Sequence, residues 1–269
     1  MRTKKDIVST WNQLFILTDV FDNIASVMKS CITRNVDLCI LQPLRLILGP
    51  SGIGKTAAIK HCCRCISSED KAEKTTALYI TAPCPFSLRA FCQRILDELG
   101  ESISQTLSLD AVIRLTYKQL ITREVRVVVV DDIQNLMYSR SISVIESMGF
   151  LKDLAMNCNT AVVGCGLPEA EELLGINKEF SKRFLSLIKL TPFSYDDKFL
   201  ALLKDIEKQM DTPFPLNLSN IDWHVPEILF RVSDGLIGNL LAYINEIFLN
   251  IGLYDDAVEL SQMKVTRAA

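Results

Sequence analysis

The chain has 269 residues, 49% of them hydrophobic and 23% charged, with a formal net charge of −3. This composition excludes a largely disordered chain, and the length allows one large α/β domain plus a smaller one. No apolar run approaches the roughly 20 residues of a membrane helix, and the basic N-terminus lacks the apolar stretch of a signal peptide. A protein that binds nucleic acid strongly on its own is usually basic, and the net charge of this chain is negative. Contact with DNA would therefore need a local basic strip or many copies in a row. We therefore expect a cytoplasmic protein that does not bind membranes.

Residues 1–40 are predicted to be mainly helical, because their apolar residues recur at near-helical spacing. Strands and helices then alternate, which is typical of a parallel sheet buried by helices on both faces. Ser87 is a plausible N-cap for one of these helices, and Gly100 a plausible stop. The predicted strands are 44–48, 75–83, 125–133, one from 160, and one before 193, and the predicted helices are 56–63, 87–100, 109–121 and 142–159.

After residue 193 the pattern changes and only helices are predicted, at 196–210, 226–235 and 239–252. We thus expect an α/β core with a parallel sheet, followed by a small all-helical domain. The expected domains are a helical segment (1–40), an α/β core (41–193) and a helical domain (194–269).

A phosphate-binding loop is predicted between the first strand and its helix, where GPSGIGKT matches the G-x-x-x-x-G-K-[ST] pattern. Glycines let the backbone amides point at phosphate oxygens, the lysine reaches the β- and γ-phosphates, and the threonine hydroxyl joins the Mg²⁺ ligands. The alternative is a chance glycine-rich turn. The candidate ATP-binding residues are Gly49, Pro50, Ser51, Gly52, Ile53, Gly54, Lys55 and Thr56.

Two adjacent acids end the buried strand VVVV. Asp131 suits the carboxylate that holds Mg²⁺ with Thr56, and Asp132 stands where a base could polarise the attacking water. The alternative is a strand end with two solvated acids.

These motifs, in this order, resemble the AAA+ ATPases, and more narrowly the TniB/TnsC group of transposition ATPases. The resemblance covers about residues 40–250, and its group-specific parts are residues 79–100 and the exit loop VVGCGLPEA. The C-terminal helices resemble those of the compact members found in CRISPR-associated transposons.

The resemblance implies a bacterial ATPase that assembles as a ring or helical filament on double-stranded DNA without reading its sequence. Its expected partners are other copies of itself, a TniQ-like targeting factor and a transposase. Hydrolysis would release the filament.

The resemblance also implies roles for individual residues. Arg183, in SKRFL, matches an arginine that reaches a neighbouring subunit's ATP. The alternative is an ordinary surface arginine, because a lone Arg-Phe pair is a weak signal. Arg89 matches a position that tracks the DNA backbone, Thr106 lies near a second polar contact, and Arg94 extends the strip. The alternative for these three is a solvated surface.

Three departures from the family pattern indicate slow hydrolysis. Asp132 replaces the usual glutamate and is one methylene shorter, and a misplacement of about 1 Å can cost about 10²-fold in rate. Cys165 and Leu167 stand where a polar side chain commonly contacts the γ-phosphate, and Asn239 stands where a basic residue often touches the nucleotide.

Two other functions stay open: an ATP-binding interaction platform with little turnover, and an AAA+ helper of replication of the initiator or loader type. A zinc site at Cys62 and Cys65 is disfavoured, because no second pair of ligands stands at suitable spacing.

Overall fold

The computed structural model describes residues 18–37, 44–69, 76–139, 141–176, 184–210, 212 and 215–250. The chain divides into two compact units, one spanning Asp19–Thr191 and the other containing the residues from Pro192 onward. Residues 1–17 and Arg183 lie outside the described residues, so the predicted start of the first helix and the predicted arginine finger remain predictions.

The first unit is built on a five-stranded sheet in the order β2-β3-β4-β1-β5. All neighbouring strands pair in parallel, which confirms the predicted α/β fold. Because β1 lies between β4 and β5, the loop that follows it opens at the sheet's carboxyl edge between the ends of these two strands. The strands are β1 (Leu44–Leu48), β2 (Ala77–Thr81), β3 (Val127–Asp131), β4 (Ala161–Gly166) and β5 (Phe184–Lys189).

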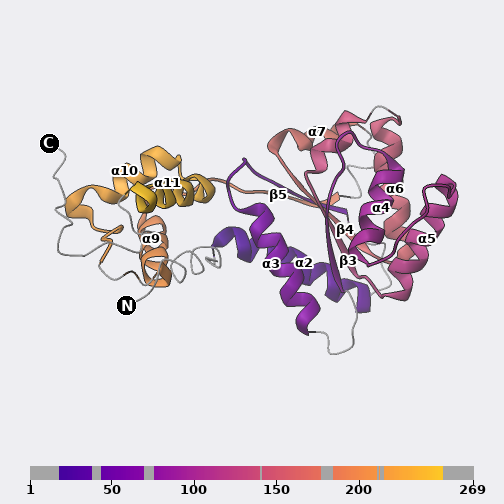
Figure 1. The fold of residues 1–269 in the computed structure, drawn as a ribbon, viewed down its shortest axis with the longest axis horizontal. Coiled ribbons are helices and arrows are strands. Elements are labelled where there is room, and N and C mark those ends of the chain that lie inside the picture. The colour runs from indigo at the N-terminus through magenta and orange to yellow at the C-terminus, as the bar shows by residue number, and fades with distance from the viewer. Residues whose placement is uncertain are drawn as a thin grey trace. The chain divides into compact units, whose positions relative to one another are not determined.

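Helices cover both faces of this sheet. On one face α2 packs against α3, and on the other α4, α5 and α6 lie side by side (Figure 1). Short turns, η2 and α7, follow β4. The helical elements of this unit are α2 (Asp19–Asp37), α3 (Lys55–Glu69), α4 (Leu88–Glu98), α5 (Leu109–Thr122), α6 (Val144–Cys158), η2 (Pro168–Glu171) and α7 (Glu172–Gly175).

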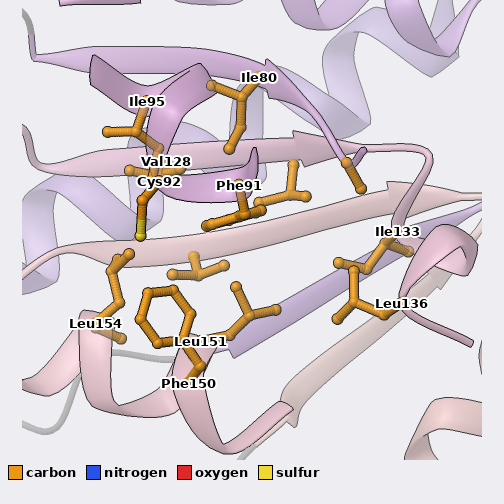
Figure 2. Close-up of a cluster of buried hydrophobic side chains, with 14 of the residues drawn as sticks. Ile80, Phe91, Cys92, Ile95, Val128, Ile133, Leu136, Phe150, Leu151 and Leu154 are labelled. Atoms are coloured by element: carbon orange, nitrogen blue, oxygen red, sulfur yellow. The ribbon is translucent and has the colours of Figure 1, made fainter. Parts of the chain in front are cut away.

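The main core lies between the sheet and the α4–α6 layer, as Figure 2 shows. Phe91 of α4 is fully buried and its ring lies 5.6 Å from Phe86 and 6.0 Å from Phe150, measured between centroids. Ile133 and Leu136, which follow β3, insert into the same cluster. The segment that carries the second acid is therefore fixed to the core on both sides of that acid.

The sequence signals for α4 are confirmed. The Ser87 hydroxyl accepts a hydrogen bond from the Ala90 backbone N–H at 3.3 Å, and Gly100 has the positive φ of +75° that commonly ends a helix.

The prediction for the end of β3 was wrong by two residues. The strand ends at Asp131 rather than 133, and Asp132 takes a left-handed conformation with φ of 53°. A 3₁₀ helix that was not predicted, η1 (Ile133–Tyr138), follows. Aspartate tolerates this backbone region better than most residues, so the chain can turn sharply there.

The second unit is helical in its described part, as predicted. It contains α9 (Asp197–Met210), η3 (Ile221–Trp223), α10 (Val225–Ser233) and α11 (Ile237–Asn250). The predicted apolar face of α9 is buried against α10 and α11. Across the described residues, no helix is both long enough and apolar enough to span a bilayer.

Candidate nucleotide site

The loop between β1 and α3 is fixed at its start by the neighbouring strands. The Gly49 backbone N–H donates to the Gly166 carbonyl at 3.1 Å, and a Cβ on Gly49 would lie only 2.9 Å from the Cβ of Leu190. Gly52 and Gly54 have φ values of 79° and 94°, which are strained for other residues. The glycines of the motif are therefore required by the backbone path of the loop.

Lys55, the first residue of α3, lies against this loop. Its Nζ donates to the backbone carbonyls of Gly49 at 2.7 Å and Pro50 at 2.9 Å. Burial lowers the pKa of Lys55, and the nearby Asp131 opposes that shift. Among the described residues, the hydrogen-bond partners of this buried ammonium are the two neutral carbonyls. A buried ammonium gains strongly when phosphate oxygens are offered, so the loop fits a nucleotide's phosphates.

Asp131, at the end of β3, is tied directly to the loop. Its Oδ2 accepts hydrogen bonds from the Thr56 hydroxyl at 2.6 Å and from the Tyr79 hydroxyl at 3.1 Å. Its Oδ1 accepts the backbone N–H of Asp132 at 3.0 Å. A threonine hydroxyl next to a buried carboxylate is the oxygen pair that Mg²⁺ uses beside phosphates, so the donor set fits this ion.

Tyr79 is a site residue that sequence reasoning missed. It lies on β2, and burial raises the pKa of its hydroxyl to about 12, so it stays protonated and can donate to Asp131. The Nζ of Lys60 lies 5.0 Å from the centre of the Tyr79 ring. Tyr79 and Thr81 alternate onto one face at the carboxyl end of β2, beside the end of β3. The strand pattern gives this shared face, but the contact with Asp131 depends on β2 being the neighbour of β3.

Asp132 is held by a second residue that was missed. The Gln134 Nε2 donates to the Asp132 Oδ1 at 3.2 Å, and the Gln134 Oε1 accepts the backbone N–H of Leu167 at 3.2 Å. Gln134 is itself buried. Nothing in the strand pattern could have identified it, because its position depends on the unpredicted 3₁₀ turn.

The side chains of Cys165 and Leu167, at the exit of β4, are apolar, as the sequence indicated. Cys165 is fully buried, and burial raises the pKa of its thiol well above the usual value. Leu167 contributes only its backbone N–H. Asn239, in the second unit, donates to the Ser233 carbonyl at 3.4 Å.

The structure brings together two of the three predicted DNA-contact residues. The Arg89 guanidinium donates to the Leu107 carbonyl, in the turn where Thr106 is exposed. The exposed Arg94 instead donates to the Thr81 carbonyl at the end of β2, away from that turn.

Cys62 and Cys63 are buried on α3, and burial raises their pKa values to about 11 and about 12. In the described part of the chain, no group of three or more His, Cys, Asp or Glu side chains stands close enough to hold a metal.

Solved structures similar to this chain share its fold at low sequence identity. The ORC2 protein of Aeropyrum pernix, in ADPNP–ADP complexes, matches with a TM-score of 0.70 and 14% identity, over 90% of this chain and 67% of that chain. The ORC1 protein of the same organism, in complex with DNA, matches with a TM-score of 0.62 and 16% identity, over 87% of this chain and 61% of that chain. Domain III of the Thermotoga maritima replication initiation protein DnaA matches with a TM-score of 0.55 and 14% identity, over 92% and 90%.

These proteins show that the fold is that of the AAA+ ATPases. A search of curated proteins found no match. A family model described as "Bacterial TniB protein" matches residues 15–195, which is well over half of the chain. The protein therefore belongs to the TniB family.

Proposed function

We propose that this protein is an ATP-dependent regulator of transposition that assembles on double-stranded DNA and leaves it when ATP is hydrolysed. The observation that carries the ATPase activity is the 2.6 Å hydrogen bond between Thr56 Oγ1 and Asp131 Oδ2, beside the buried Lys55. This direct contact between the loop after β1 and the acidic end of β3 supports a single nucleotide site. The DNA-binding part is supported by membership of the TniB family and by the DNA-bound ORC1 neighbour.

Each residue of the site has a chemical role in this proposal. Lys55 binds the β- and γ-phosphates, and the loop amides surround them. Thr56 and Asp131 hold Mg²⁺, which neutralises charge on the transferred phosphoryl group. Asp132 orients the attacking water and accepts its proton.

Assembly would complete the site. Arg183 is proposed to reach the ATP of the next subunit, so that hydrolysis depends on neighbouring copies in a ring or filament. Residues 41–193 would form the nucleotide-binding core, 194–269 the lid, and 1–40 a helical extension. A TniQ-like factor and a transposase would bind the assembled form in the bacterial cytoplasm.

One specific observation favours a second candidate, a platform that binds ATP but hydrolyses it very slowly. At the β4 exit, Leu167 contributes its backbone N–H to Gln134 and offers no polar side chain to a γ-phosphate or to the attacking water. A role in replication, suggested by the ORC and DnaA neighbours, shares the fold but has no support from the matching family.

The direct test is the affinity for a duplex DNA of random sequence, measured by fluorescence anisotropy with ATP, ADP and a non-hydrolysable ATP analogue. Tight binding with ATP and the analogue but not with ADP is expected, together with similar affinity for unrelated duplex sequences. Equal affinity in all nucleotide states would contradict the proposal.

Tyr79→Phe is expected to weaken Mg²⁺ binding. Removing the hydroxyl leaves the Asp131 Oδ2 held by Thr56 alone, and losing such a supporting hydrogen bond typically costs about 10-fold or more in metal affinity. A Mg²⁺ titration of phosphate release should show a half-maximal concentration raised by about 10-fold. Tyr117→Phe, which alters a hydroxyl beside Asn157 on the opposite face of the sheet, is the control. An unchanged Mg²⁺ requirement in Tyr79→Phe would contradict this role.

Arg89→Ala is expected to weaken binding to duplex DNA in a salt-dependent way. Loss of one phosphate contact should lower the slope of log affinity against log salt by about 1 while ATP binding is retained. Because Arg89 also bonds to the Leu107 carbonyl, its removal should loosen the turn that carries Thr106.

Two further variants separate these effects. Arg89→Lys keeps the charge but not the planar guanidinium, so it should retain most of the salt slope. Arg114→Ala removes an exposed arginine from α5 and should change neither quantity. DNA affinity in Arg89→Ala equal to that of the natural protein would remove Arg89 from the DNA surface.

A further inference from the structure

The side chain of Gln134 links the segment after β3 to the exit of β4 by hydrogen bonds. It is buried, with 7% of its surface exposed, and its amide makes one hydrogen bond on each side. The Oε1 accepts from the Leu167 N–H at the exit of β4, and the Nε2 donates to the Asp132 carboxylate after β3. Only this orientation of the amide satisfies both partners, because the backbone N–H needs an acceptor and the carboxylate needs a donor.

Gln134 and its neighbour Ile133 pack directly against the two glycines of β4. A Cβ on Gly166 would lie 2.9 Å from Ile133 Cγ2 and would also strike the Gln134 Oε1. A Cβ on Gly164 would lie 3.0 Å from Ile133 Cγ1. The two glycines of β4 thus let the start of η1 pack directly on the strand, and Ile133 is anchored in the core there (Figure 2).

Asp132 is consequently held from two directions. Its left-handed backbone is fixed by the hydrogen bond from its own N–H to Asp131 Oδ1, at 3.0 Å. Its side chain is fixed by Gln134, at 3.2 Å. A short carboxylate on a strained turn has few other restraints, since no second described side chain donates to it.

We propose that Gln134 is a positioning residue that sets the direction of the Asp132 carboxylate. Because Gln134 also bonds to the Leu167 N–H, this direction depends on the position of the backbone at the exit of β4. This inference rests on the proposed hydrolytic function. Gln134 does not touch the reacting atoms; it acts through Asp132. A shift of β4 relative to β3 would therefore move the base, even though β4 offers no polar side chain at Leu167.

The test uses the natural protein, Gln134→Met and Gln134→Glu, each also combined with Asp132→Asn. Methionine has a similar length and volume but makes neither bond, whereas glutamate can still accept from the Leu167 N–H and cannot donate to Asp132 when ionised. Phosphate release with duplex DNA gives kcat and KM, and an ATP analogue gives nucleotide affinity. Asn135→Ala is the matched control. It removes a side-chain hydrogen bond from the same turn, which Asn135 Nδ2 donates to the Ala82 carbonyl, and the Asn135 side chain makes no bond to the Asp132 carboxylate.

Both Gln134 variants are expected to lose about 10- to 100-fold in kcat, with KM and nucleotide affinity changed less than about 3-fold. With Asp132→Asn present, the same changes should cause no further loss, while Asn135→Ala should leave kcat close to natural. An unaffected kcat, an equal loss in both backgrounds, or a parallel loss of nucleotide affinity would each overturn the inference. If the natural protein itself shows no turnover that depends on Asp132, the hydrolytic function fails and this inference fails with it, which is a different and separately visible result.

Discussion

Lys55→Ala is expected to lower the affinity for ATP by about 10²-fold or more. A hydrogen bond between charged groups contributes about 1.5–3 kcal/mol, and Lys55 stands where it can meet two phosphates. The residue is the natural partner of these phosphates because its Nζ already lies on the loop, bonded to the carbonyls of Gly49 and Pro50. Removing it also leaves those carbonyls without their donor, which loosens the loop.

Equilibrium binding of a fluorescent ATP analogue measures this effect, and Lys118→Ala is the matched control. Lys118 is an exposed lysine on α5, away from the carboxyl edge of the sheet, and its loss should not change the affinity. DNA binding that requires ATP should be lost in Lys55→Ala as well. If Lys55→Ala bound ATP as tightly as the natural protein, the loop would not be the nucleotide site.

Asp132→Asn is expected to lower the rate of phosphate release by at least about 10²-fold and to leave ATP binding intact. General-base catalysis contributes about 10²- to 10⁴-fold, and an amide has almost no basicity. Asparagine is otherwise a close match. It tolerates the left-handed backbone of this position, and its carbonyl oxygen can still accept from Gln134.

Asp153→Asn, an exposed acid on α6, serves as the control for this change and should keep full turnover. Thermal unfolding of both variants should match that of the natural protein within a few degrees. Undiminished phosphate release in Asp132→Asn would exclude Asp132 as the base. No release from the natural protein, with DNA-bound assemblies intact under ATP, would favour the platform function.

The sequence predicted the sheet and the phosphate loop because both depend on local patterns. The run Val127–Val130 is buried at every residue, as an all-apolar strand between two neighbours should be. Gly52 and Gly54 of the loop are needed by the loop's own backbone, whose φ values there are 79° and 94°. Such signals are contained within a few adjacent residues, so they can be identified without the fold.

The supporting residues of the site could not be predicted in the same way. Tyr79 meets Asp131 only because β2 and β3 are neighbours in register, Tyr79 beside Val129 and Thr81 beside Asp131. Gln134 meets Leu167 because an unexpected 3₁₀ turn folds back on β4. These contacts depend on strand order and on a single left-handed residue, neither of which leaves a periodic pattern in the sequence.

Both the length of the Asp132 side chain and its hydrogen bonds bear on the rate of hydrolysis. Its shorter side chain alone predicts a base set back from the water. In the structure this carboxylate accepts a hydrogen bond from Gln134, and the Asp132 backbone N–H donates to Asp131 Oδ1. We therefore expect the carboxylate to be directed as well as short. The expected result is slow hydrolysis at a reproducible rate, which would set how long the assembled protein stays on DNA.

The most direct test of whether hydrolysis controls release is the lifetime of the protein on duplex DNA. Complexes formed with ATP would be challenged with excess competitor DNA, and the loss of bound protein followed for the natural chain and for Asp132→Asn. The account predicts that the natural protein leaves at a rate matching its phosphate release, while Asp132→Asn, and the natural protein with a non-hydrolysable analogue, stay bound many times longer. Equal lifetimes in all three cases would contradict the claim that hydrolysis at this site controls release from DNA.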